Sequence, residues 1–442
     1  DWLITGYGVD ARIEAFRAYE RMGMRDLTVF VGEPNDPAVH GTSGADNRET
    51  RIFPGSDERA KTFKGLYEPV WLDAGKTHIN PANTYAAYLY KTVKEYGQYV
   101  KFWEIVNEPD FTYTSAGWID SSSPESWYNT NPRPQDLMNL KAPIFYYIRE
   151  LRVAYDVIKT LEPNDYVATG GIGYASFLDA VLRNTDNPID GSVTSEYPLR
   201  GGAYFDVLSF HSYPMYSLRS WSTSLNDFVY SRHSDSAADV FLSTKKDFET
   251  VLKKYGYGAQ YPEKQWIVTE TDMPQKQVAE VWGSTDSANN YLIKASVLAQ
   301  ANGIKQIYKY GLGQDSAGSD IFNTMGVYGS IDSAPNIASV PKTEQYKALS
   351  TLSTLLYGKV YDASRTNLLA FPSNVRGAAF RDVNTGMYTY VLWAKTMIDK
   401  SESVSASYQF PFSVTLTRRE WNYSSTGQST GASNIVTLSG TP

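Results

Sequence analysis

The feature of this sequence that most constrains its fold is a regular alternation of short apolar runs with longer amphipathic stretches. Many of the short runs carry apolar side chains on both faces, which is typical of buried parallel strands. These runs are residues 27–31, 69–72, 102–106, 166–169, 207–210, 266–269 and 304–308. The pattern therefore predicts a parallel sheet.

The stretches between the runs have the periodicity of amphipathic helices. In the clearest one, Ile144 is followed by Ile148, Leu151, Tyr155 and Ile158 at spacings of four, three, four and three residues, which places them on one helix face. Similar stripes run through residues 13–19, 85–96, 292–299 and 346–356. We expect each of these segments to be a helix.

Strands that alternate with helices form βαβ units, and about eight such units fit a closed (β/α)8 TIM barrel. The missing strand would come first along the chain, either at residues 3–8 or in a segment lost from the N-terminus. An open doubly wound sheet is the competing α/β architecture. It is disfavoured because the glycine clusters do not complete a dinucleotide-binding motif; they are Gly6 with Gly8, and Gly170 with Gly171 and Gly173.

The pattern changes near residue 360. Runs at 378–382, 387–393, 405–410 and 414–418 are separated by Asn, Gly and Ser clusters and show no helical stripe. We therefore predict a catalytic barrel over residues 1–360 and a small C-terminal all-β sandwich over residues 361–442, cut short at its end. No flexible linker separates the two parts, so we expect the second to pack against the first.

Composition disfavours several classes of function. The 41 Lys and Arg residues against 48 Asp and Glu give a net charge of -7, which argues against a nucleic-acid partner. There is no Cys, and the four His residues show no metal-ligand spacing; they are His40, His78, His211 and His233. The acidic loop at residues 315–320 lacks the calcium-loop pattern. We therefore expect no cofactor and no metal.

Location and assembly are less constrained by the sequence. No apolar stretch approaches the roughly 20 residues of a membrane helix, so we expect no membrane insertion. The chain begins at Asp1 without a signal segment. We expect a secreted, periplasmic or cell-surface protein whose signal is not visible, and the oligomeric state stays open.

Two of the predicted strands are followed by a glutamate at their carboxyl ends. The run 102–106 leads into Asn107, Glu108 and Pro109, and the run 266–269 leads into Glu270. Barrel chemistry takes place at the carboxyl ends of the strands. Paired carboxyl groups suit cleavage of a glycosidic bond, because one protonates the leaving oxygen while the other attacks or stabilises the anomeric centre.

These residues resemble the retaining glycoside hydrolases of clan A, which are (β/α)8 barrels. In that clan, Asn-Glu-Pro at the end of strand four carries the acid/base, and a Glu at the end of strand seven is the nucleophile. Counting the predicted strands places Glu108 on the fourth and Glu270 on the seventh. The resemblance therefore implies that Glu108 is the acid/base, that Glu270 is the nucleophile, and that Asn107 holds the sugar 2-hydroxyl.

Further substrate contacts are expected near the strand ends. The segment His211-Ser212-Tyr213-Pro214 resembles the clan's strand-six ending, where a His or Tyr contacts the nucleophile or the sugar. The chain is rich in aromatic residues, with 34 Tyr, 18 Phe and 10 Trp, and such rings stack on sugar faces. Strand-end candidates are Tyr113, Trp118, Tyr174, Trp282 and Tyr310, and the clan's usual platform after strand eight favours Tyr310.

Within the clan, the chain looks most like the family of β-agarases and β-porphyranases. The segments that carry this resemblance are residues 103–110, 205–214 and 325–328, the last ahead of the predicted sandwich. It implies an endo-acting enzyme that cuts β-1,4 bonds of red-algal galactan, with a polysaccharide or oligosaccharide as its partner. Alternatives are a clan A hydrolase acting on xylan, mannan or glucan, a non-catalytic glycan-binding barrel, and a polysaccharide-anchoring protein that binds through the sandwich.

Overall fold

The computed structural model describes residues 12–32, 63, 65–315, 320–331, 334–427, 429–432 and 435–439. Its contacts divide the chain into two compact units. Unit 1 comprises Asp1–His211 and Asp247–Ile267, and unit 2 comprises Ser212–Lys246 and Val268–Pro442. The chain passes from one unit to the other within three elements: β4 (Val207–Ser212), α6 (Ser234–Lys254) and β7 (Gln265–Thr271).

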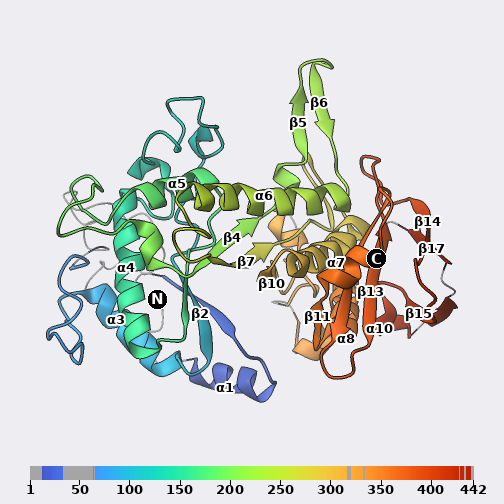
Figure 1. The fold of residues 1–442 in the computed structure, drawn as a ribbon, viewed down its shortest axis with the longest axis horizontal. Coiled ribbons are helices and arrows are strands. Elements are labelled where there is room, and N and C mark those ends of the chain that lie inside the picture. The colour runs from blue at the N-terminus through green and yellow to red at the C-terminus, as the bar shows by residue number, and fades with distance from the viewer. Residues whose placement is uncertain are drawn as a thin grey trace. The chain divides into compact units, whose positions relative to one another are not determined.

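Unit 1 is built on a parallel sheet. Its strands β1 (Leu27–Val31), β2 (Val100–Ile105), β3 (Tyr166–Ala168) and β4 are neighbours in that order. Figure 1 labels β2 and β4 of this sheet. β7 begins next to β4, where the Gln265 backbone N–H donates to the Asp206 carbonyl at 3.1 Å. Because β1 to β4 run parallel, the segments that follow β2 and β4 leave the sheet at the same edge.

The described helices of unit 1 include α1 (Ile13–Arg21), α3 (Thr84–Tyr96), α4 (Ile144–Leu161) and α5 (Ala175–Arg183). α3 begins at a capped end, since the Asn83 side chain accepts the Ala86 N–H. Four of the five residues in the stripe predicted for α4 are buried, and the fifth, Tyr155, is half-buried. The strands contribute a core cluster of Phe102, Ala168, Val207 and Ile267. Short 3-10 turns lie at Ser115–Gly117, Pro134–Asp136 and Gly201–Tyr204.

Unit 2 contains the C-terminal part of β7 and the strand that follows it in the sheet order, β10 (Ile304–Lys309). Its helices include α7 (Thr285–Ala301) and α8 (Glu344–Leu356). One hairpin pairs β5 (Arg219–Ser222) with β6 (Asp227–Tyr230), and another pairs β8 (Lys276–Val278) with β9 (Val281–Ser284). Short 3-10 turns lie at Pro214–Tyr216, Phe322–Thr324 and Ile337–Ser339.

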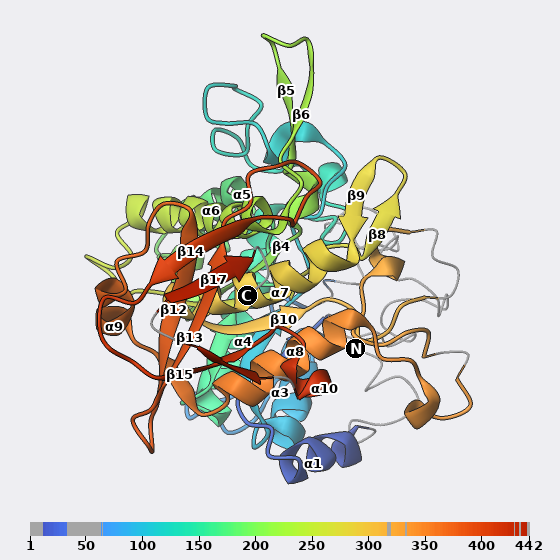
Figure 2. The same ribbon diagram turned by 90° about the vertical axis from the view of Figure 1, so that its right-hand side faces the viewer.

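From residue 359 onward the chain forms small antiparallel sheets (Figure 2). The first sheet joins three strands, and two further pairs follow. The first comprises β11 (Lys359–Tyr361), β12 (Val375–Asp382) and β13 (Tyr388–Ala394); the pairs are β14 (Ser405–Gln409) with β17 (Ile435–Ser439), and β15 (Leu416–Arg419) with β16 (Ser429–Ala432). Two short helices, α9 (Ala363–Leu368) and α10 (Tyr423–Thr426), interrupt the strands.

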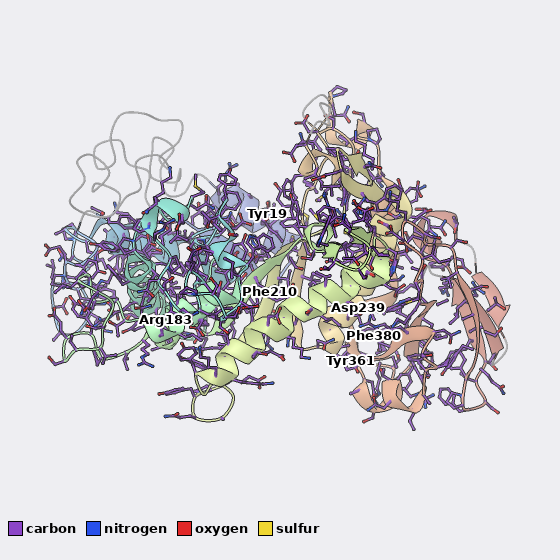
Figure 3. The ribbon with its side chains drawn as sticks, turned by 90° about the horizontal axis from the view of Figure 1, so that it is seen from above. Tyr19, Arg183, Phe210, Asp239, Tyr361 and Phe380 are labelled. Carbon is purple, nitrogen blue, oxygen red and sulfur yellow. The ribbon has the colours of Figure 1, made fainter. Side chains whose placement is uncertain are left out.

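These C-terminal strands share a hydrophobic core with the helices of unit 2. Leu292 and Val297 of α7 belong to the same cluster as Phe380 of β12 and Trp393 of β13. Figure 3 labels Phe380 and Tyr361, whose ring centroids are 6.2 Å apart in an edge-to-face arrangement. The strands therefore pack on helices that precede them. The sandwich arrangement and the boundary at residue 360 stay predictions.

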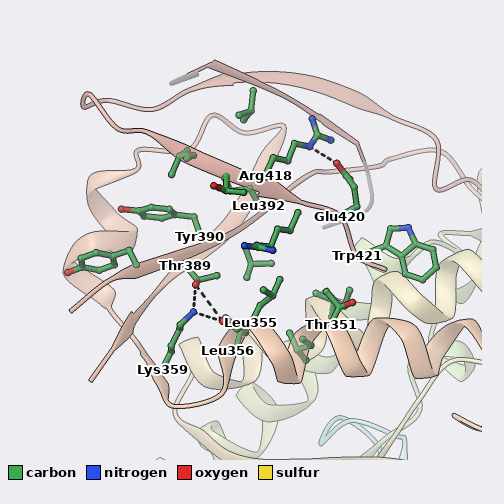
Figure 4. A pocket seen from close by; sticks show the side chains of 18 of the residues that line it. Thr351, Leu355, Leu356, Lys359, Thr389, Tyr390, Leu392, Arg418, Glu420 and Trp421 are labelled. Atoms are coloured by element: carbon green, nitrogen blue, oxygen red, sulfur yellow. Dashed lines mark hydrogen bonds and ion pairs between the residues drawn. The ribbon is translucent and has the colours of Figure 1, made fainter. Parts of the chain in front are cut away.

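A pocket of about 520 Å³ lies in unit 2 between α8 and the C-terminal strands (Figure 4). Leu355 and Leu356 of α8 face Tyr390, Leu392 and Trp421 across it. At one side Lys359 donates to the Leu355 carbonyl and to Thr389, both at 2.6 Å. None of the predicted site residues lines this pocket.

The sequence-based strand predictions agree with the structure at six of seven positions, and the run at 69–72 is the exception. There Trp71 forms only an isolated antiparallel bridge to Ile79. β1 pairs directly with β2, which leaves no place between them for the predicted third strand. Among the described strands, the one that leads to Glu108 is therefore second in the sheet order, and the prediction that it is the fourth had counted the run at 69–72.

The sheet fits an α/β, TIM-like architecture, with six strands among the described residues. The predicted strand at residues 3–8 and the chain end at 440–442 lie outside the described residues, as does part of the loop at 315–320. Within the described part of the chain, no helix has the length and apolar character needed to cross a membrane.

Candidate active site

Glu108 lies in an unusual turn at the end of β2. Val106 and Glu108 both have positive φ, at 60° and 45°. Such values are uncommon for any residue other than glycine and rare for a β-branched residue such as Val106. The Glu108 N–H donates to the Gly170 carbonyl at 2.6 Å, and the Asn139 side chain donates to the Asn107 and Glu108 carbonyls at 3.1 Å each. Several hydrogen bonds therefore fix this strained turn.

The turn also requires a glycine beside it. A Cβ atom at Gly170 would lie 1.7 Å from the Val106 carbonyl oxygen. Gly171, with φ of 62°, lies under the imidazole of His211, where a Cβ would be 2.1 Å from Nε2. The glycine pair thus lets β2 and the His211 ring approach the same stretch of backbone.

His211 is the partner of the Glu108 carboxyl group. Its Nδ1 lies 2.8 Å from Glu108 Oε1. The His211 side chain is 4% exposed and that of Glu108 is 28% exposed, so the imidazole is enclosed while the carboxyl group stays accessible. This arrangement orients the carboxyl group and leaves one side of it open.

A second carboxyl group lies below this turn. Asp110 is buried, and its Oδ2 accepts the backbone N–H groups of Gly173 and Tyr174, both at 2.8 Å. Burial raises the pKa of Asp110 to about 7. The negative charge of Glu108 also raises this pKa, whereas the two hydrogen bonds lower it. Asp110 therefore ties the turn after β2 to the segment that leads into α5.

In unit 2, Glu270 occupies the end of β7. Its Oε2 accepts a hydrogen bond of 2.5 Å from the Tyr213 hydroxyl. The Tyr213 ring packs edge-on against Tyr310 and Phe322, with centroids 5.8 and 5.0 Å away, and these two rings also contact each other at 5.5 Å. An aromatic cluster thus holds the hydroxyl that binds Glu270.

A buried ion pair supports the same strand end. Asp272 forms an ion pair with Lys309 of β10 and accepts a hydrogen bond of 3.0 Å from the Gln345 side chain. Burial raises the pKa of Asp272, and the charge of Lys309 opposes this. The Tyr310 N–H donates to the Thr271 carbonyl at 3.0 Å. These contacts fix β7 against β10 beyond Glu270.

The partners of the two glutamates are neighbours in the chain. His211, which contacts Glu108, and Tyr213, which contacts Glu270, are separated only by Ser212 at the end of β4. The structure thus gives both His211 and Tyr213 a carboxyl partner, where the resemblance had left open whether either contacts the nucleophile or the sugar. Glu108 and His211 are also residue types that can bind a divalent cation.

The other predicted contacts are more scattered. Asn107 is half-buried beside Glu108, whereas Tyr113 is 80% exposed and Trp118 is 61% exposed. Trp118 packs edge-on against Tyr174, at 5.1 Å between centroids. Trp282 lies in β9, and its buried indole N–H has no hydrogen-bond partner among the described residues.

Sequence reasoning missed four residues that support the glutamates: Asp110, Asn139, Asp272 and Phe322. Asp110 and Asp272 each follow a predicted catalytic Glu by two residues, and that spacing is a signal that could have found them. Asn139 and Phe322 come from loops whose sequences carry no such pattern.

No family model matches the sequence, and no curated protein matches it. Among solved structures, it is similar to a Rhizomucor miehei β-1,3-glucanosyltransferase (14% identity, 74% of this chain and 80% of that chain, TM-score 0.36). It is also similar to a Croceicoccus marinus glucosidase (11% identity, 80% of this chain and 71% of that chain, TM-score 0.41). A third similar structure is a family 51 α-L-arabinofuranosidase from Bifidobacterium longum (9% identity, 98% of this chain and 76% of that chain, TM-score 0.46).

Proposed function

We propose that the protein is a retaining glycoside hydrolase in which Glu270 is the nucleophile and Glu108 is the acid/base. The observation that carries this proposal is that each glutamate has its own partner, and that the two partners, His211 and Tyr213, are two residues apart at the end of β4. A short, shared segment of backbone is well suited to hold two carboxyl groups for one reaction.

In the first step, an oxygen of the Glu270 carboxylate attacks the anomeric carbon. The bond from that carbon to the glycosidic oxygen breaks, and Glu108 donates its proton to the departing oxygen. The product is a glycosyl ester on Glu270 together with the released sugar. The Tyr213 hydroxyl, which donates to Glu270 Oε2, orients this carboxylate for the attack.

In the second step, Glu108 is a carboxylate and takes a proton from water while the water oxygen attacks the anomeric carbon. The ester bond breaks, Glu270 returns as a carboxylate, and Glu108 is again protonated. His211 keeps the Glu108 carboxyl group in place through both steps, because its Nδ1 contacts Oε1.

We propose as substrate a β-linked polysaccharide, with β-1,4 bonds of a red-algal galactan such as agarose or porphyran as the first choice. The support is the resemblance of residues 103–110, 205–214 and 325–328 to β-agarases and β-porphyranases. Endo action, and a location outside the cytoplasm where such polymers occur, belong to the same proposal. Asn107, Tyr310, Trp282, Tyr113 and Trp118 are its proposed sugar contacts.

The test is hydrolysis by the Glu270→Gln variant. We first identify a substrate by release of reducing ends from agarose, porphyran, xylan, mannan and β-glucans. On that substrate we expect Glu270→Gln to lose at least about 10³-fold in kcat, because an amide cannot form the ester. The matched control is Glu125→Gln, which changes an exposed glutamate and should leave kcat unaltered. Equal activity of Glu270→Gln and the wild type would overturn the proposal.

A further inference from the structure

A second concave site lies in unit 1, at the edge of the sheet opposite to Glu108. It is a pocket of about 890 Å³ lined by residues from the loop after α5, the start of β4 and the loop between α6 and β7. Asp206 and Gln265, at the amino ends of β4 and β7, belong to its lining, whereas Glu108 follows the carboxyl end of β2. The volume is within the range of ligand-binding pockets, which is about 300–1,000 Å³.

Its wall is formed by a tyrosine-rich loop. Tyr255, Tyr257 and Tyr261 occur within seven residues, and all three line the pocket. The Tyr257 and Tyr261 ring centroids are 5.3 Å apart, with 38° between the ring planes, and Tyr261 is 48% exposed. The loop is held by its own backbone, since the Tyr261 N–H donates to the Gly256 carbonyl at 2.9 Å. The rings are therefore pre-positioned, with ring surface open to solvent.

Lys264 anchors the base of this pocket. Its ammonium group donates to the backbone carbonyls of Gly202 and Phe205, at 2.8 and 2.5 Å, and lies 4.6 Å from the Tyr257 ring centroid. Burial lowers the pKa of Lys264 to about 8, partly opposed by the charge of Asp206. The lysine thus carries its charge at neutral pH beside the aromatic rings of the pocket wall.

The charge of the lining favours an anionic ligand. Two carboxylates line the pocket, Asp206 and Glu263. The charge of Asp206 is balanced by an ion pair of 2.8 Å with Lys159, so Glu263 is the lining carboxylate that adds negative charge. Arg200 and Lys253 line the pocket and form no ion pair within the described part of the chain. This basic lining contrasts with the net charge of -7 for the whole chain.

From this combination we infer a second carbohydrate-binding site, which takes a segment of an acidic glycan bearing sulfate or carboxylate groups. Sugar rings stack on Tyr261 and Tyr257, and the anionic substituents lie near Arg200, Lys253 and Lys264. The site rests on the proposed function in one respect: its glycan is the polymer that the enzyme cuts. β4 spans roughly 20 Å at about 3.3 Å per residue, so this site holds the polymer away from the reacting bond.

The experiment counts binding sites by calorimetry in the Glu270→Gln background, which prevents cleavage. The probes are a porphyran-derived sulfated hexasaccharide, a neutral agarose hexasaccharide and a galacturonate hexasaccharide. We expect two sites for the sulfated probe, one of which is weakened roughly fivefold or more by Tyr261→Ala and by the pair Arg200→Gln/Lys253→Gln. The matched control is Tyr357→Ala, which removes a tyrosine that is 87% exposed and lies outside the pocket.

The outcomes separate this inference from the proposed function. If Glu270 is not catalytic but the inference holds, an acidic probe still binds and Tyr261→Ala still weakens it. If the site number and affinities are the same in Tyr261→Ala and Tyr357→Ala, the inference is overturned while hydrolysis stands. Preference for the sulfated or the galacturonate probe identifies the anionic group, and tighter binding of the neutral probe at this site would contradict an acidic ligand.

Discussion

The hydrogen bond from Tyr213 to Glu270 gives the residue-scale account its sharpest test. Tyr213→Phe keeps the ring that packs on Tyr310 and Phe322 but removes the hydroxyl that donates to Glu270. A hydrogen bond to a charged group contributes about 1.5–3 kcal/mol, so we expect kcat/KM to fall roughly 10- to 100-fold with little change in thermal stability. Tyr357→Phe, at a position that is 87% exposed and has no proposed sugar contact, is the control and should retain activity.

Asp110 gives a prediction about pH and stability. Its pKa is about 7 in the folded protein and 3.8 in its ordinary state, so the folded protein holds this proton more tightly. The stabilisation is fully present below pH 3.8 and is lost as the pH rises through 7. Asp110→Asn keeps an oxygen for the Gly173 and Tyr174 N–H groups without a charge. We expect the melting temperature of Asp110→Asn, relative to that of the wild type, to increase as the pH rises from 4.5 to 8. A difference between the two melting temperatures that does not change with pH would contradict this.

At the residue scale, Glu108, Glu270, His211 and Tyr213 could all be identified as candidates from the sequence, but which carboxyl group each of the last two contacts could not. Glu108 and Glu270 follow apolar runs, so their position at strand ends could be inferred from sequence alone. Whether Tyr213 or His211 contacts a given carboxyl group depends on side-chain direction at the end of β4, which the sequence pattern does not give. The strained φ values at Val106 and Glu108 depend on contacts with Gly170, far away in the sequence.

At the element scale, a buried ion pair joins the helices of unit 2 to its C-terminal strands. Lys294 of α7 lies 2.9 Å from Asp235 of α6, and Asp235 also accepts the Trp393 indole N–H of β13 at 2.8 Å. Asp235→Asn would leave the buried Lys294 without its charged partner. We expect a loss of about 3–5 kcal/mol in the free energy of unfolding.

The control for this change lies on the same helix. Asp239, labelled in Figure 3, forms a 2.6 Å ion pair with Arg376 of β12, but its side chain is 57% exposed. Because solvent screens exposed pairs, Asp239→Asn should cost less than about 1 kcal/mol. Denaturant unfolding of both variants measures the contrast, and equal losses would show that the buried pair does not join these elements as described.

The helices with a regular apolar stripe were the elements that the sequence predicted best. The stripes at 13–19, 85–96, 144–158, 292–299 and 346–356 all lie in helices. Burial follows the stripes less closely, since α1 has no buried residue and Leu349 of α8 is exposed. The strand predicted at 69–72 was wrong, since Pro69 has no N–H to donate and Leu72 is 64% exposed. Its apolar composition was compatible with a strand, but no neighbouring strand was available, because β1 and β2 pair with each other.

At the scale of the whole molecule, Glu108 belongs to unit 1 and Glu270 belongs to unit 2. The chain crosses between the units within β4, immediately after His211 and before Tyr213. The α/β class could be predicted because strands and helices alternate along the sequence. Closure of the barrel stays a prediction, since the sheet has six strands among the described residues.

The most direct test of the central claim is the stereochemistry of hydrolysis, followed by proton NMR on the polysaccharide that the wild type cuts. Double displacement through Glu270 predicts that the β-anomer of the new reducing end appears first and then mutarotates to the equilibrium mixture. An α-anomer as first product would mean single displacement and would contradict the assignment of Glu270 as nucleophile and Glu108 as acid/base.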